Sequence, residues 1–177
     1  LLDSQLAKAY VARAGLHSHF ENFESAIADY SSAIGMDYAG SFLASYEGLF
    51  HLRGEAYLNQ ADEISLFAGV FDQADSTVAK LNYSLAAADF STYIDLVSDE
   101  SEWEATAELY YRGLAYLGVG QYAIAVKDLS EYIQVDNLYR PYEWRGIAYS
   151  ALGLFDLALR DYSLNPNSVS DVLRGIA

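Results

Sequence analysis

The chain has 177 residues, of which 53% are hydrophobic and 20% charged, with two prolines and no cysteine. This composition can supply a continuous core, and the absence of cysteine excludes disulfides and thiolate metal sites. The formal net charge of −15 disfavours nucleic acid and anionic membrane as partners. No apolar run reaches the roughly 18–20 residues that span a bilayer, so we expect no membrane insertion.

The chain begins at Leu1 without a Met or a leader, so we expect a processed or trimmed piece of a longer protein. The sequence leaves the compartment open: the protein is either cytoplasmic or exported after removal of a leader.

A pair of short phrases occurs four times along the chain. The first is an Arg, a small residue and, one turn later, an aromatic residue or His. The second is Ala-x-x-Asp, followed by a large residue and Ser. In three copies the Arg and the Asp are 16 residues apart, and in the second copy this spacing is 20 residues longer. A chain that repeats itself in this way is built from stacked units.

Within each half of a copy, apolar residues fall at helical intervals, as Leu109, Tyr116 and Leu117 do. Short polar or glycine-bearing stretches, such as 118–121 and 153–154, separate the halves. Each copy is therefore predicted to form two antiparallel helices joined by a tight turn. The small residue after the Arg lets the second helix approach the first closely.

These phrases resemble the tetratricopeptide repeat family, although the final Pro of that pattern is matched only at Pro166. The resemblance implies an all-α fold, a right-handed superhelical solenoid of antiparallel helix pairs. We expect one domain over residues 1–177. It comprises repeats at about 6–37, 45–97, 104–137 and 139–166, followed by a terminal half-repeat at 168–177.

The repeated Arg and Asp residues predict a ladder of ion pairs between packed helices, within a repeat or between adjacent repeats. A planar guanidinium suits a partly buried carboxylate, and such pairs set register more than stability. The alternative is that these charges are solvated at a fixed helical phase. The residues concerned are Arg13, Asp29, Arg53, Asp89, Arg112, Asp128, Arg145 and Asp161.

The extra residues of the second repeat, about 58–82, predict that both of its helices are lengthened into a protruding hairpin. Apolar residues continue at helical spacing on both sides of a polar turn at 72–76. The end of the hairpin either offers an apolar surface to a partner or is covered by the two helices themselves. The sequon beginning at Asn82 would carry a glycan in an exported protein.

The connection between the second and third repeats is strongly acidic around Trp103. It lacks the ligand alternation and glycine of an EF-hand loop, so we interpret it as a solvated loop and a helix N-terminus. The acids are Asp95, Asp99, Glu100, Glu102, Glu104 and Glu108.

No motif in the sequence indicates catalysis. A phosphate-binding loop, a nucleophile elbow and a set of metal ligands at recognisable spacing are all missing. His17 takes the place of Tyr57 and Tyr116 in the other repeats, so packing explains it better than metal binding does. We therefore expect no enzyme activity, cofactor or metal.

The resemblance to tetratricopeptide repeats also implies a concave groove, lined by the first helix of each repeat. An apolar and aromatic groove with acidic edges favours a hydrophobic helix or extended segment that bears basic residues. Some of these side chains could instead pack between neighbouring repeats. The predicted groove residues are Val11, His51, Leu52, Glu55, Tyr110, Tyr111, Leu114, Glu143, Trp144 and Ile147.

Two functions follow from these patterns. One is an adaptor or scaffold that binds another protein through the groove or the hairpin. The other is a structural subunit that stacks on copies of itself, because a further phrase begins at Arg174 and the last repeat has no obviously polar cap.

Overall fold

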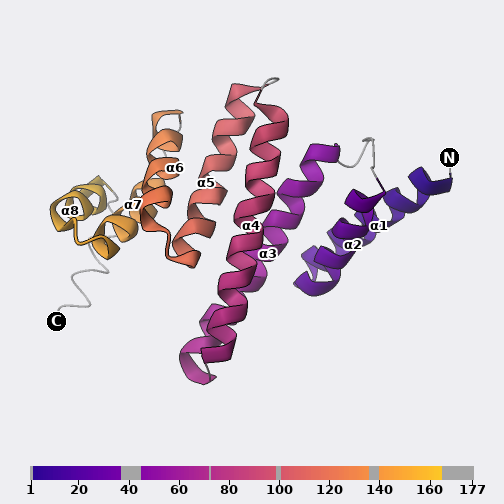
Figure 1. Cartoon of the computed structure of the whole chain (residues 1–177), viewed down its shortest axis with the longest axis horizontal. Helices are drawn as coiled ribbons and strands as arrows, with labels where there is room; N and C mark the ends of the chain where they lie inside the picture. The colour runs from indigo at the N-terminus through magenta and orange to yellow at the C-terminus, as the bar shows by residue number, and fades with distance from the viewer. Residues whose placement is uncertain (1, 37–44, 72, 99–100, 136–139, 165–177) are drawn as a thin grey trace. The chain divides into compact units, whose positions relative to one another are not determined.

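Every secondary-structure element that the computed structural model describes is an α-helix (Figure 1). The described residues are 2–36, 45–71, 73–98, 101–135 and 140–164, without the side chains of 2–4, 64–71 and 73–76. The helices are α1 (Leu2–His19), α2 (Phe23–Gly35), α3 (Tyr46–Phe71), α4 (Gln73–Val97), α5 (Glu102–Val119), α6 (Tyr122–Val135), α7 (Arg140–Ala151) and α8 (Phe155–Leu164). The predicted half-repeat at 168–177 lies outside the described residues.

The chain divides into two compact units, Leu1–Glu108 and Leu109–Ala177. In the first unit α1 packs against α2, α2 against α3, and α3 against α4 along its length (Figure 1). In the second unit α6 packs against α7 and α7 against α8. Within each unit these helices pack against their neighbours in sequence, which confirms the predicted all-α fold of repeated helix pairs. The right-handed superhelix involves both units and stays a prediction.

Close packing inside each pair depends on the small residue after the repeated Arg. A Cβ atom on Gly54, Gly113 or Gly146 would lie only 2.6–2.9 Å from a ring or leucine carbon of the opposite helix. The atoms it would meet belong to the large residue after the repeated Asp, namely Phe90, Leu129 and Tyr162. In the first pair the same place is taken by Ala14, which is buried together with Tyr30.

The turn inside three of the pairs has one geometry, set eight residues after the Arg. The residue there has positive φ: Glu21 at 58°, Gly120 at 89° and Gly153 at 75°. The next backbone N–H returns to a carbonyl of the helix just ended, as from Gln121 to Tyr116 at 2.8 Å. This closure satisfies helix-terminal carbonyls and favours glycine at the positive-φ position.

The second pair has no such turn, because α3 continues through Ala61 to Phe71. Helices α3 and α4 have 26 and 25 residues, against 18 and 14 in α5 and α6. Hydrogen bonds join the start of the extra segment to its end. Asn82 Nδ2 donates to Gln60 Oε1 at 3.0 Å, and the Tyr83 hydroxyl donates to Asp62 Oδ1 at 2.6 Å. The structure does not describe the side chains at the far end of this hairpin, so the predicted apolar surface there stays a prediction.

Candidate partner-binding surface

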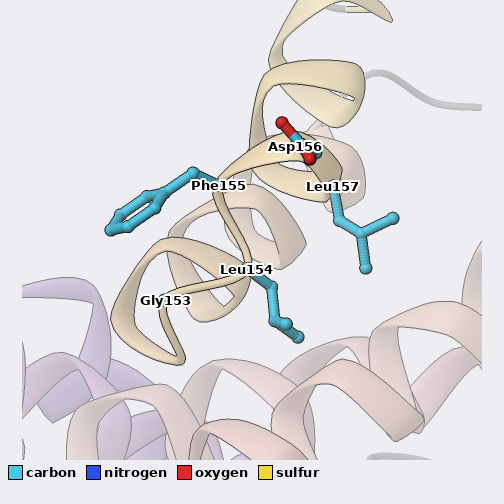
Figure 2. Close-up of a pocket in the computed structure, with 5 residues that line it drawn as sticks. All are labelled: Gly153, Leu154, Phe155, Asp156 and Leu157. Atoms are coloured by element: carbon cyan, nitrogen blue, oxygen red, sulfur yellow. The ribbon is translucent and has the colours of Figure 1, made fainter.

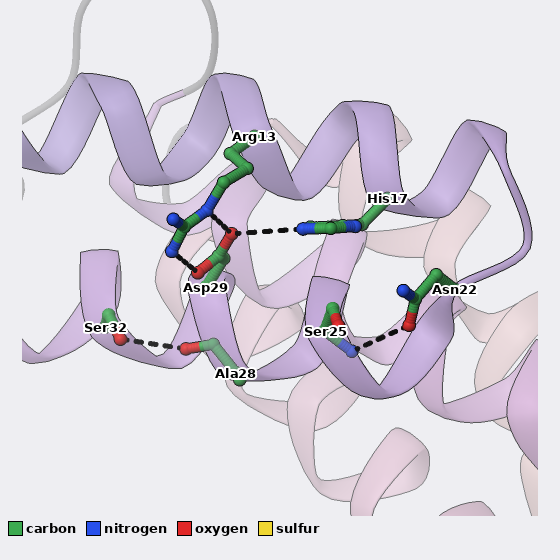
Figure 3. Close-up of polar contacts among 7 residues, drawn as sticks. All are labelled: Arg13, His17, Asn22, Ser25, Ala28, Asp29 and Ser32. Atoms are coloured by element: carbon green, nitrogen blue, oxygen red, sulfur yellow. Dashed lines mark hydrogen bonds and ion pairs between the residues drawn. The ribbon is translucent and has the colours of Figure 1, made fainter.

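The repeated Arg and Asp residues meet as bidentate pairs within each helix pair. Arg13 Nε and Nη2 donate to the two carboxylate oxygens of Asp29 at 2.6 and 2.7 Å (Figure 3). The same two nitrogens of Arg53, Arg112 and Arg145 donate at 2.7–2.9 Å to the Asp residues at the equivalent places, Asp89, Asp128 and Asp161. A planar guanidinium facing a carboxylate in this way fixes both the distance and the rotation of two helices.

The pairs are alike in geometry but differ in how far water reaches them. The Arg13 side chain is 60% exposed, against 16–20% for the other three arginines. The hydrogen bond from Arg13 holds the pKa of Asp29 below its ordinary value. At Asp89 the loss of hydration on burial outweighs the effect of Arg53, and the pKa of that carboxyl is raised.

A third nitrogen of two arginines reaches the preceding repeat. Arg53 Nη1 donates to Ser31 Oγ at 3.0 Å, and Arg145 Nη1 donates to Ser130 Oγ at 3.1 Å. These serines are the last residues of the repeated Asp phrase, so one guanidinium joins its own repeat to its neighbour. The sequence indicated the Arg–Asp pairs, but it did not indicate this second role.

The predicted groove residue His51 belongs to a charged cluster in the first unit. Its Nδ1 is 2.9 Å from a carboxylate oxygen of Glu108, and its Nε2 is 3.5 Å from Glu55, one turn along α3. Burial lowers the pKa of His51, but the hydrogen bond and charge of Glu108, with the charge of Glu55, outweigh it and raise the pKa. The cluster joins α3 to the beginning of α5.

Glu108 corrects the interpretation of the acidic connection as wholly solvated. It is buried, whereas Glu102 and Glu104 are exposed in the first turn of α5, where Ser101 Oγ accepts the backbone N–H of Glu104. Leu49 and Pro141 occupy the place of Glu108 in other repeats, four residues before the Arg, and both are buried. A carboxylate at a place that is otherwise apolar was the signal for a buried partner.

One predicted groove residue of the first unit lies in its core, and another packs against that core. Val11 is buried in a cluster formed by α1, α2 and α3, so it cannot contact a partner, and its assignment to the groove is wrong. Leu52 is partly buried against the same cluster, which supports the alternative of packing between repeats for this residue. The position of a residue within the repeat identifies the helix face on which it lies, but not the neighbouring residues that cover that face.

The groove residues of the second unit include an aromatic group and an exposed pair. The ring of Tyr110 is 5.4 Å from that of Tyr111 and 5.3 Å from that of Tyr132 on α6. On α7, Trp144 and Ile147 are 36% and 39% exposed. Leu114 and Glu143 are intermediate in exposure.

The structure also contradicts the use of Asn82 as a glycosylation site. Its side chain is buried, and the nitrogen that would carry the sugar is the one that donates to Gln60. A glycan on that buried side chain would force α3 and α4 apart.

Among the described residues, no three His, Cys, Asp or Glu side chains are grouped so that they could hold a metal ion. None of the helices in the described ranges is long and apolar enough to cross a membrane. The turn between α7 and α8 borders an open hollow of about 430 Å³, whose described lining residues include the ionisable Asp156 (Figure 2). His17 lies 4.0 Å from Asp29, beside the first Arg–Asp pair (Figure 3).

No protein-family model matches the sequence, and no curated protein matches it. Among solved structures, the crystal structure of MamA protein is similar to this chain at 15% sequence identity. The match covers 96% of this chain and 95% of the MamA chain, with a TM-score of 0.43. A likeness at this level carries no conclusion about function.

Proposed function

We propose that this chain is a non-catalytic scaffold of the tetratricopeptide type, which binds a segment of another protein through the first helices of its repeats. The observation that carries the proposal is the exposed pair Trp144 and Ile147 on α7. A tryptophan with an aliphatic neighbour on the same helix face is the type of anchor that contributes most to protein interfaces.

The binding surface has two parts in the second unit. Tyr110, Tyr111 and Leu114 belong to α5, and Glu143, Trp144 and Ile147 belong to α7. The surface is apolar and aromatic with one acid, on a chain of net charge −15. A partner segment with apolar anchors and nearby Lys or Arg complements both properties.

The test uses immobilised synthetic peptides that share apolar helix-forming positions and differ only in carrying Lys or Glu elsewhere. The wild-type chain is expected to be retained by the Lys set and to pass the Glu set. Replacing Tyr111 and Trp144 together by Ala should remove retention while the circular dichroism spectrum keeps its helical signal.

Trp103→Ala is the matched control, because Trp103 is 60% exposed near the start of α5 and lies outside the proposed surface. This variant should be retained as the wild type is. Retention of the Tyr111/Trp144 variant, or equal binding of both peptide sets, would contradict the proposal.

A further inference from the structure

We propose that this chain stacks head to tail on a second copy of itself, with α8 of one copy packed against α1 of the next. The contact would repeat the junction already made inside the chain, where the second helix of one repeat packs against the first helix of the following repeat. The junctions between α2 and α3 and between α6 and α7 define its chemistry.

The internal junction has a polar part and an apolar part. The polar part is the hydrogen bond from the Arg Nη1 to a Ser Oγ of the preceding repeat, at 3.0 Å for Ser31 and 3.1 Å for Ser130. In the apolar part, Leu49 and Ala56 of α3 are buried in the core cluster of the first unit. Phe23 and Ile27 of α2 and Leu52 of α3 pack against the same cluster. The α2 residues are spaced by four, so with Ser31 they form one helix face.

Helix α8 has the same face, and nothing in the described part of the chain covers it. Counted from the repeated Asp, α8 has the same kinds of residue as α2 at three equivalent positions. The equivalent residues are Phe155 and Phe23, Leu159 and Ile27, and Ser163 and Ser31. Phe155 and Leu159 are 65% and 63% exposed, whereas Phe23 and Ile27 are partly buried. Figure 2 shows Phe155 projecting away from the helix. Ser163 donates to the Arg160 carbonyl at 2.7 Å, which leaves its lone pairs to accept a hydrogen bond.

Helix α1 has the complementary face. Counted from the repeated Arg, three exposed residues of α1 are equivalent to the α3 residues at the internal junction. The equivalent residues are Ala9 and Leu49, Ala12 and Leu52, and Leu16 and Ala56. Arg13 uses Nε and Nη2 for Asp29, and its Nη1 has no partner within the residues that the structure describes. The Arg13 side chain is 60% exposed, against 18% for Arg53.

A second copy is the occupant that we propose, because it supplies the complementary face for each of the two exposed helix faces. Residues 168–177, outside the described ranges, carry a further Arg phrase at Arg174 and are the competing occupant of α8, but they would leave α1 uncovered. The contact joins different surfaces of the two copies, so it propagates into chains or closes into a ring. Because each copy has a net charge of −15, repulsion opposes stacking, and added salt should strengthen it.

The first test uses the absence of cysteine, which makes every introduced thiol unique. Ala12→Cys and Leu159→Cys are made in separate full-length chains, mixed and oxidised. Their positions are equivalent to those of Leu52 and Ile27 at the internal junction. The mixed pair should therefore give a disulfide-linked dimer. Its yield should be several-fold higher than that of the control mixture, Leu159→Cys with Ala28→Cys. Ala28 is exposed on α2, outside the proposed contact. Equal yields would overturn the proposal.

Residues 168–177 are tested as the competing occupant by placing Leu159→Cys and Leu173→Cys in one chain. Leu173 is equivalent to Ala12, because each directly precedes a repeated Arg. Stacking of copies predicts little disulfide within one chain. A disulfide formed within a monomer in high yield at all concentrations would assign the α8 face to residues 168–177 and overturn the proposal.

Sedimentation velocity supplies a measurement without introduced thiols. The weight-average mass of the wild-type chain should rise with protein concentration and with salt, and Leu159→Asp should abolish the rise. Leu81→Asp is the control, because Leu81 is similarly exposed on α4, and it should associate as the wild type does. A wild-type chain that stays monomeric at high concentration and high salt would refute the stacking.

Discussion

His51 of α3 and the buried Glu108 of α5 form a partly buried hydrogen-bonded pair, with Nδ1 of the imidazole 2.9 Å from the carboxylate. The rings of Phe90 and Tyr93 lie about 6 Å from the imidazole ring. These rings reduce the hydration of the pair, so the attraction between opposite charges is stronger there than at a fully exposed site.

This pair predicts that stability falls as pH rises above neutrality. The pKa of His51 is raised in the folded chain, so its contribution is complete below the unfolded value of about 6.5 and is lost as pH rises through the folded value. The pKa of Glu55 is raised by burial, which gives the same sign at lower pH. The free energy of unfolding, measured with urea, should be larger near pH 6 than near pH 8.5.

Glu108→Gln should remove most of this difference between the two pH values. Glu104→Gln removes the same formal charge at an exposed position of the same helix, and it should leave the pH dependence intact. A Glu108→Gln chain with the wild-type pH dependence would show that another group titrates.

The fold could be predicted from the sequence because the Arg and Asp phrases repeat at one spacing. A spacing of 16 residues places the two side chains opposite each other across a helix pair joined by a tight turn, as with Arg145 and Asp161. The candidate surface was harder to predict. Val11 and His51 share one place in the repeat, yet one is buried in the core and the other pairs with Glu108. That difference depends on which neighbouring residues cover a helix, and one repeat does not encode it.

The Arg145–Asp161 pair predicts a strong asymmetry between single and double substitutions. Arg145→Met leaves a buried carboxylate without its partner, so unfolding should become easier by roughly 2–4 kcal/mol, somewhat less than for a fully buried pair. Adding Asp161→Leu should recover much of the loss, because neither member then needs hydration. Arg160→Met, at an exposed arginine of α8, is the control and should change stability little. Equal losses in the single and double variants would assign the pair no energetic coupling.

Two glycines should respond in opposite directions to the same substitution. Gly146→Ala places a Cβ atom 2.6 Å from Tyr162 Cε1, so α7 and α8 must move apart at a cost of about 1–3 kcal/mol. Gly15→Ala meets no atom within 4 Å inside α1, and it should stabilise the chain by about 0.5–1 kcal/mol. Thermal unfolding of the two variants measures both signs. Similar destabilisation by both would show that close approach is not the reason for glycine at position 146.

Among the described residues, Glu21 is the one residue other than glycine with a positive φ. It stands at φ 58°, where Gly120 and Gly153 stand in other repeats. A left-handed conformation costs a non-glycine residue about 1–2 kcal/mol. Glycine avoids this strain, but its greater freedom in the unfolded chain offsets about 0.4–1 kcal/mol of the gain. Glu21→Gly should therefore stabilise the chain by roughly 0.5–1 kcal/mol.

The matched control is Glu21→Ala, which removes the same negative charge but keeps the Cβ atom and hence the backbone strain. The two variants differ only in that atom, so a gain seen with Gly and absent with Ala comes from the turn. Gly120→Ala should show the reverse, a loss of about 1 kcal/mol. If Gly and Ala at position 21 gave the same unfolding temperature, the effect would belong to the charge of Glu21, and the positive φ would carry no measurable cost.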